Sequence, residues 1–166
     1  MVPEERRSQG LVLDFSVADN MLMAAYDRLT QGLGLDKLKG DAMVRAQIKS
    51  LGVKTSGPEQ SVRFLSGGNQ QKVVIAREVL AQPKLMLVGQ PTRGVDIGTI
   101  ESIHTQLLAL RDAGVAILLV SVELEEVRAL ADRILVMCGG RITGELKIEE
   151  FDTTRIGLLM GGMHKS

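Results

Sequence analysis

Leu65-Ser66-Gly67-Gly68-Asn69-Gln70-Gln71 is the most informative stretch of this chain, because it opens a helical pattern that continues to Leu80. Serine caps helices and glycine loosens the entry to them, so the stretch can be a plain N-terminal cap. It can also be an anion site, since a helix N-terminus carries a partial charge of about +0.5 and bare glycine amides can face an anion. The tripeptide Ser66-Gly67-Gly68 alone leaves both interpretations open.

A phosphate-binding loop is the motif expected beside an anion site of this kind. Its pattern, G-x-x-x-x-G-K-[ST], does not occur in the 166 residues. A chain that has the stretch Leu65–Gln71 but no phosphate loop cannot hydrolyse a nucleotide unaided. We therefore expect it to be part of a nucleotide hydrolase.

The composition is that of a globular protein, with 45% hydrophobic and 24% charged residues. The length of 166 residues suits one domain, or one domain with a small appended lobe. Lys+Arg 20 against Asp+Glu 20 gives no net charge, which argues against a nucleic-acid surface. The apolar run Val115–Val122 is too short to span a bilayer. A lone cysteine, Cys138, fits a reducing cytosol.

The front of the chain has helical character over residues 16–52. Asp14 or Ser16 can cap a first helix, and a second helix is predicted from about Asp41 to Leu51. Glycines are predicted to punctuate this region at Gly32, Gly34, Gly40 and Gly52.

Beyond Pro58 apolar strands alternate with helices. Strands are predicted at 85–88, 115–120, 133–137 and 141–146, and helices at 70–80, 97–111, 123–131 and 148–160. Such alternation is typical of a parallel sheet covered on both faces. The fold class is therefore α/β, with a helical insertion at the front.

The order of these segments resembles the ATP-binding-cassette (ABC) ATPases, and the resemblance covers nearly the whole chain. It rests on Leu65–Gln71, the string Gln90-Pro91-Thr92-Arg93-Gly94-Val95-Asp96 and the helices and strands between and after them. The resemblance implies a partial P-loop NTPase fold that lacks the Walker A strand and phosphate loop. It also implies that the signature of this chain contacts ATP held by the opposite cassette. The signature residues concerned are Ser66, Gly67, Gly68, Asn69 and Gln70.

Further motifs narrow the resemblance to the second cassette of tandem ATPases that serve simple-sugar and nucleoside importers. Glu4 stands at the Q-loop position and Asp96 in the D-loop. The implied parts are a Q-loop segment with a helical subdomain (1–64), a partial ATPase core (65–147) and a C-terminal helix with its tail (148–166). The implied partners are a second cassette, a membrane permease and, indirectly, a solute-binding protein, with no nucleic acid. The implied location is cytoplasmic, peripheral on the inner face of the cell membrane.

The chain departs from the family at three chemical positions. Gly89 and Gln90 replace the Asp-Glu pair that holds Mg²⁺ and polarises water, and Val122 replaces the switch histidine. Glycine offers no carboxylate to Mg²⁺, and glutamine cannot take a proton. We therefore expect ATP and Mg²⁺ only in the assembled cassette pair, no cofactor on the isolated chain, and no intact catalytic or metal residue.

Other reactive residues suggest no separate chemistry. His104 is expected on a helix surface or interface, His164 in the tail, and Cys138 as a buried thiol. Arg93 can face a nucleotide or the seam between cassettes. Two rival functions stay open, a non-catalytic interaction or regulatory module and a cassette of DNA repair or translation. The neutral charge weighs against the latter.

Overall fold

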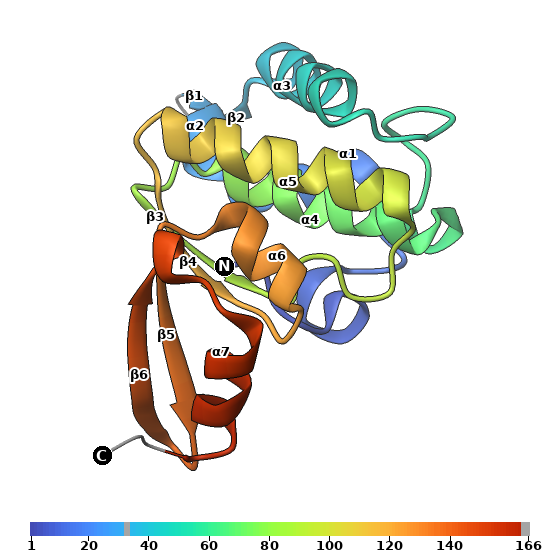
Figure 1. Ribbon diagram of the computed structural model, residues 1–166. Helices are drawn as coiled ribbons and strands as arrows, with labels where there is room; N and C mark the ends of the chain where they lie inside the picture. Colours follow the sequence, from blue (N-terminus) through green and yellow to red (C-terminus); the bar gives the residue numbers. More distant parts are fainter. Residues whose placement is uncertain (32–33, 164–166) are drawn as a thin grey trace. The chain divides into compact units, whose positions relative to one another are not determined.

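The computed structural model describes residues 1–31 and 34–163, so Gly32 and His164 lie outside the described residues. The chain divides into two compact units, Met1–Val120 and Ser121–Ser166 (Figure 1). No helix among the described residues is long and apolar enough to cross a membrane.

The front of the first unit is helical, as predicted, and contains a short hairpin that the sequence did not predict. Its elements are the π-helix η1 (Arg6–Gly10), α1 (Val17–Leu22), α2 (Tyr26–Leu29), β1 (Thr30–Gln31), β2 (Gly34–Leu35) and α3 (Lys37–Leu51). Of the two candidate caps for the first helix, Ser16 is the one used. It forms a capping box with Asp19.

Helix α3 begins at Lys37 rather than near the predicted Asp41, because the Asp36 side chain accepts from the Lys39 amide at 2.9 Å. Gly40 does not interrupt the helical region as predicted. It lies in the first turn of α3, where an added Cβ would stand 3.3 Å from Leu22 Cδ1. Close packing therefore accounts for this glycine. The helix ends at Gly52 in the left-handed conformation, as predicted.

The rest of the first unit builds a small parallel sheet beside a buried helix. Its elements are the 3₁₀ turn η2 (Val62–Phe64), α4 (Gly67–Leu80), β3 (Leu85–Gly89), α5 (Ile97–Asp112) and β4 (Ala116–Val120). Strands β3 and β4 pair in parallel, and Val2 adds a parallel bridge to Val88. Among the described residues, β4 has a hydrogen-bonded strand neighbour on one side only, which is β3.

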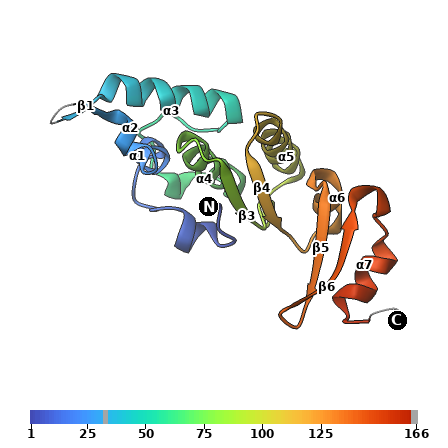
Figure 2. The ribbon, with the colours of Figure 1, turned by 90° about the vertical axis from the view of Figure 1, so that its left-hand side faces the viewer.

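Helix α4 is the centre of the first unit. Four consecutive residues, Val73, Val74, Ile75 and Ala76, are fully buried, as the wide apolar pattern predicted. Helices α1 and α3 pack against α4 (Figures 1 and 2). Helix α4 is thereby covered by other helices of the first unit.

The second unit is an antiparallel hairpin with a helix on it. Its elements are α6 (Leu124–Leu130), β5 (Arg133–Cys138), β6 (Arg141–Lys147), the 3₁₀ turn η3 (Ile148–Glu150) and α7 (Thr153–Met160). Its buried core consists of Ile134, Val136, Leu146 and Ile156. Gly139 and Gly140 both have positive φ and form the tight turn of the hairpin.

The predicted α/β class and its parallel sheet are confirmed, but two details differ. Among the strands of the described residues, β3 and β4 form the parallel ladder, whereas β5 and β6 form a hairpin and pair antiparallel. The predicted continuous helix over 148–160 is interrupted, because Phe151 and Asp152 leave the helical conformation and the Asp152 side chain caps α7 at the Arg155 amide, 2.6 Å away.

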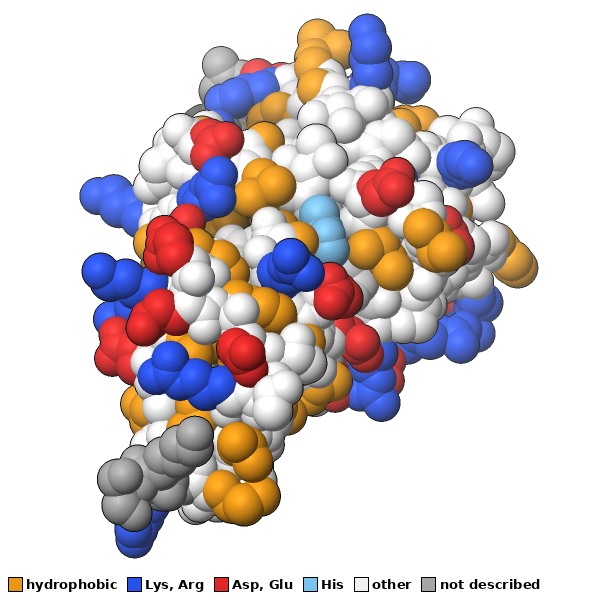
Figure 3. Space-filling model, viewed as in Figure 1, with side chains coloured by type: hydrophobic (Ala, Val, Ile, Leu, Met, Phe, Trp, Pro, Cys, Tyr) orange, Lys and Arg blue, Asp and Glu red, His pale blue; other side chains and the backbone are white. Residues whose placement is uncertain are grey.

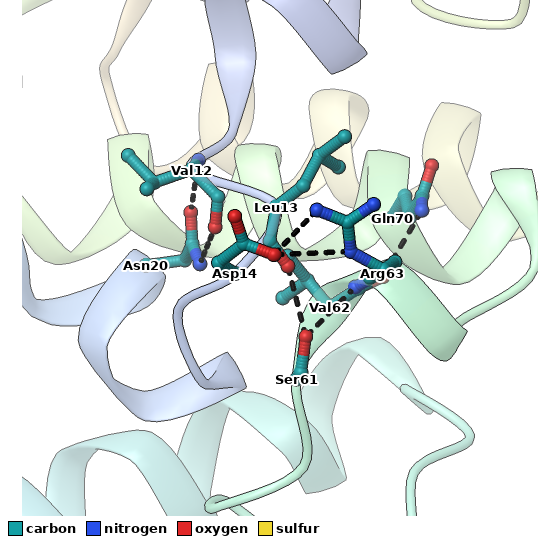
Figure 4. A network of polar contacts seen from close by, with 8 residues as sticks. All are labelled: Val12, Leu13, Asp14, Asn20, Ser61, Val62, Arg63 and Gln70. Atoms are coloured by element: carbon teal, nitrogen blue, oxygen red, sulfur yellow. Dashed lines mark hydrogen bonds and ion pairs between the residues drawn. The ribbon is translucent and has the colours of Figure 1, made fainter.

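A polar network ties the segment before α1 to the chain near η2 (Figure 4). Asn20 is fully buried, and its Oδ1 accepts from the Val12 amide at 2.9 Å. Its Nδ2 donates to the carbonyls of Val12 and Ser16, both at 3.0 Å. The Ser61 hydroxyl donates to the Leu13 carbonyl at 2.8 Å. Side chains thus add hydrogen bonds to the backbone of the segment before α1.

Asn20→Ala is expected to lower the free energy of unfolding by about 1–3 kcal/mol, because it removes three hydrogen bonds of a fully buried side chain. Urea unfolding followed by circular dichroism measures the change. Gln9→Ala, at an exposed position, is the control and should change stability by less than about 0.5 kcal/mol. Equal effects of the two variants would contradict the importance of the network.

Candidate functional site at the start of helix α4

Ser66 caps helix α4, as the first of the two sequence interpretations predicts. Its Oγ accepts from the Asn69 amide at 3.4 Å and from Asn69 Nδ2 at 2.8 Å. The first turn closes where the Gln70 amide donates to the Ser66 carbonyl at 2.9 Å. The amides of Gly67 and Gly68 come before this bond and have no acceptor within the helix. Ser66 is exposed, so its hydroxyl can still donate a hydrogen bond to a ligand.

Two of the predicted nucleotide contacts are engaged inside the chain. The Oδ1 atom of Asn69 accepts from the Lys54 amide at 2.7 Å. Gln70 is 3% exposed, and its Nε2 donates to the Val62 carbonyl at 3.0 Å. Both side chains fasten the start of α4 to neighbouring loops.

The two glycines of the signature lie close to their neighbours. A Cβ on Gly67 would stand 2.6 Å from Arg6 Nη2 and 3.3 Å from the Gly94 carbonyl oxygen. A Cβ on Gly68 would stand 2.6 Å from Thr99 Oγ1 and 2.9 Å from Thr99 Cγ2. Packing against Thr99 therefore accounts for glycine at position 68, whereas a methyl at position 67 would displace the end of the flexible Arg6 side chain.

Asp96 lies beside this contact and caps α5. Its Oδ1 accepts from the Thr99 amide at 3.0 Å and its Oδ2 from Thr99 Oγ1 at 2.8 Å. These hydrogen bonds, that from the side chain first, lower the pKa of the Asp96 carboxyl. Lys72, on α4, is 9% exposed and donates to the Gly52 carbonyl at 3.2 Å. Burial lowers the pKa of the Lys72 ammonium.

The segment before η1 contacts the turn before α5. Glu4 forms an ion pair with Arg93, so the Arg93 side chain contacts a residue of its own chain. Arg6 donates from Nη1 to the Arg93 carbonyl at 2.8 Å and from Nη2 to the Gly94 carbonyl at 3.4 Å. Sequence reasoning selected Glu4 by family position but missed Arg6. The feature of the sequence that could have indicated Arg6 was its position two residues after Glu4.

The end of β3 holds the substituted positions of the first unit. Gly89 and Gln90 are half-buried, and the Gln90 amide donates to the Val120 carbonyl at 2.8 Å. Gln90 has φ +46, a left-handed conformation that is uncommon for a residue with a side chain. Residues in such conformations are frequent at functional sites.

The described residues do not fit a resident metal. Residues 1–31 and 34–163 contain no group of three or more His, Cys, Asp or Glu that could hold one. Gly89 brings no carboxylate to the end of β3, and Val122, in the second unit, is 63% exposed and cannot coordinate an ion. We therefore assign no step to Mg²⁺ at this chain's own position.

The other reactive side chains with a described position are those of a histidine and a cysteine outside the signature. His104 is half-buried within α5. Cys138 is a half-buried free thiol at the end of β5, not the buried thiol that was expected.

Comparison with known proteins places this geometry in context. No family model matches the chain. The chain is 43% identical over 163 residues to the guanosine import ATP-binding protein NupO of Bacillus subtilis, which is 97% of this chain and 32% of that protein. It is 46% identical over 151 residues to the ribose import ATP-binding protein RbsA 1 of Streptomyces avermitilis, which is 90% of this chain and 29% of that protein.

Solved structures agree with the sequence comparison at the level of fold. The dimeric structure of a bacterial ABC transporter cassette matches with a TM-score of 0.73 at 24% identity, over 85% of this chain and 60% of that one. The chain spans about a third of the length of the curated relatives that it matches.

Gly68→Ala is expected to lower the free energy of unfolding by about 1–3 kcal/mol, because the added methyl overlaps Thr99. Gly98→Ala is the matched control, since its Cβ would meet Asp96 Oδ1 at an ordinary 3.5 Å. The control should be neutral or more stable by up to about 1 kcal/mol, from helix propensity. Urea unfolding measures both, and equal stability of the two variants would refute the close approach.

Acid should remove the contribution of Asp96. A carboxyl whose folded pKa is lowered stabilises the fold above its ordinary value of 3.8, and this is lost as the pH falls through the lowered pKa. Urea midpoints measured between about pH 5 and pH 2 should therefore fall less steeply for Asp96→Asn than for the unaltered chain. Asp27→Asn, on the exposed part of α2, is the control. Identical slopes for all three chains would exclude the Thr99 contact.

Proposed function

Because this chain has the sequence and fold of one part of an ABC ATPase of the import type, we propose that it supplies the signature face of an ATP site completed by a partner cassette. The observation that carries the proposal is the start of α4. There the exposed Ser66 hydroxyl and the amides of Gly67 and Gly68, which lack helical acceptors, form one electropositive point.

The chemistry available to this point is positioning and charge stabilisation. Phosphoryl transfer depends mainly on groups that hold the phosphates and neutralise charge in the transition state. Ser66 would donate its hydroxyl hydrogen bond to a phosphate oxygen, and the Gly67 and Gly68 amides would face the same group. Asn69 and Gln70 would act indirectly, because their side chains fix the helix start to Lys54 and Val62.

The chain's own position is proposed to be catalytically weak. Gln90 can orient water but cannot accept its proton, which costs roughly 10²–10⁴ in rate where a general base is used. Gly89 and Val122 contribute neither a carboxylate nor an imidazole. ATP and Mg²⁺ would therefore act in the assembled pair, with the phosphate loop and the metal ligands coming from the partner.

The transport setting is proposed from the relatives' names, which specify import of guanosine and ribose. The chain would serve an importer for simple sugars or nucleosides. The helical front, about residues 16–51, would contact a membrane permease at the cytoplasmic face, and a solute-binding protein would take part indirectly.

A second function is favoured by one specific observation. Gly67 and Gly68 are explained by packing against Arg6 and Thr99 alone, so the signature could serve a non-catalytic interaction module. A nucleic-acid cassette has less support. The net charge is zero, and on the face in Figure 3 basic and acidic side chains are interspersed.

Ser66→Arg separates the two leading functions. The chain is titrated into a separately produced cassette that contains a phosphate loop, and phosphate release is measured. The unaltered chain should stimulate turnover, and Ser66→Arg should reduce the stimulation by about 100-fold. Ser50→Arg, at an exposed position near the end of α3, adds the same charge as a control.

Two outcomes would count against the catalytic role. Equal stimulation by Ser66→Arg and Ser50→Arg would favour the interaction module. The chain alone is also assayed for phosphate release and, by calorimetry, for ATP binding. Mg²⁺-dependent turnover by the chain alone would reveal a complete site in this chain and would refute the proposal.

A further inference from the structure

The guanidinium of Arg6 is the meeting point of three segments that are distant in sequence. It donates to two consecutive carbonyls of one turn, those of Arg93 at 2.8 Å and Gly94 at 3.4 Å. A planar guanidinium presents a fork of donors that suits two acceptors at once. The same Nη2 atom fills the space beside Gly67, where a Cβ would lie 2.6 Å from it.

The backbone around Arg6 is anchored on both sides. Before it, the Val2 amide donates to the Leu87 carbonyl at 2.8 Å, and the Gly89 amide donates to the Val2 carbonyl at 2.9 Å. After it, Arg77 Nη1 donates to the Gly10 carbonyl at 2.6 Å. Arg6 itself is the first residue of the π-helix η1. The π-helix is a rare conformation, and the examples that occur are often found at functional sites. Arg6 therefore reaches the turn from a fixed base.

The ion pair between Glu4 and Arg93 joins the same two segments but differs in kind. Both side chains are more than half exposed, at 54% and 63%. An exposed pair of this type changes an equilibrium constant by at most about fivefold. It also holds only the side chain of Arg93, whereas Arg6 holds the main chain of the turn. Arg6 is thus the stronger link.

We propose that Arg6 is a positioning residue that fixes the 93–94 turn against the start of α4, so that Ser66 and Asp96 face their ligand in one arrangement. The catalytic part of this inference rests on the proposed function, but the positioning part does not. Arg6 acts through the carbonyls of Arg93 and Gly94 and needs no contact with nucleotide.

Hydrogen exchange of the isolated chain tests the positioning directly. In the turn, the Arg93 amide donates to the Gln90 carbonyl at 3.1 Å and the Val95 amide to the Thr92 carbonyl at 3.4 Å. Arg6→Gln should speed exchange of both amides by about 10-fold, the effect of losing hydrogen bonds from a charged donor. Arg6→Lys should not restore protection, because an ammonium cannot fork to both carbonyls.

Matched controls use the same segment. Arg7→Gln removes an exposed charge next to Arg6, and Glu4→Gln removes the exposed ion pair. Both should leave exchange of the turn within about twofold of the unaltered chain. Equal exchange in Arg6→Gln and Arg7→Gln would overturn the proposal, as would full protection in Arg6→Lys.

Gly67→Ala supplies an independent variant with the same target. Its methyl would displace Nη2, the far end of a flexible side chain, so the fold should survive. Alone it should speed exchange of the 93–95 turn, and in the Arg6→Gln background it should add little, because contacting residues couple. Additive effects of the two changes would contradict the assignment.

Turnover with the partner cassette separates this inference from the proposed function. Arg6→Gln should lower kcat about 10-fold, while Arg7→Gln should not. If exchange rises as expected but Ser66→Arg does not affect turnover, the proposed function fails and the positioning role stands. If exchange is unchanged, the role of Arg6 fails whatever the turnover.

Discussion

Close packing at the two glycines that open α4 is the constraint around which the neighbouring segments of the first unit are arranged. The guanidinium of Arg6 and the main chain at Gly94 lie close against Gly67, and Thr99 lies close against Gly68. The loop before α5 therefore approaches the helix more closely than side chains would allow. Close packing and an electropositive helix end coincide at one point, so in the proposed function the same residues serve packing and an anion.

Much of this arrangement could be predicted from sequence because it has local causes. Ser66 caps α4 through its own side chain, and the apolar run at 85–88 forms a strand whose pattern is visible without tertiary information. The pair Gly67-Gly68 indicated an unusual position in the sequence, but the sequence did not show that close packing is the cause. Packing against Thr99 involves a residue far along the chain and is not encoded by spacing.

The missed features are those in which distant contacts decide the outcome. Arg6 has no periodicity or motif of its own, and it matters because two carbonyls from residues 93 and 94 lie within its reach. Gly40 was expected to break a helix, yet it is needed where α3 passes Leu22. Gln70 looked like a ligand residue and is a buried link to Val62. Tertiary contact overrode local preference in each case.

The one-sided pairing of β4 has a consequence for the behaviour of the chain in solution. Within residues 1–31 and 34–163 its other edge has no hydrogen-bonded strand, and Leu118 and Val120 on this strand are 54% and 61% exposed. Such an edge is a template for a further strand and a starting point for aggregation. The strand that best suits the edge is one that satisfies its backbone and covers its apolar face together. Addition of a strand to this edge would therefore satisfy its backbone groups and cover Leu118 and Val120.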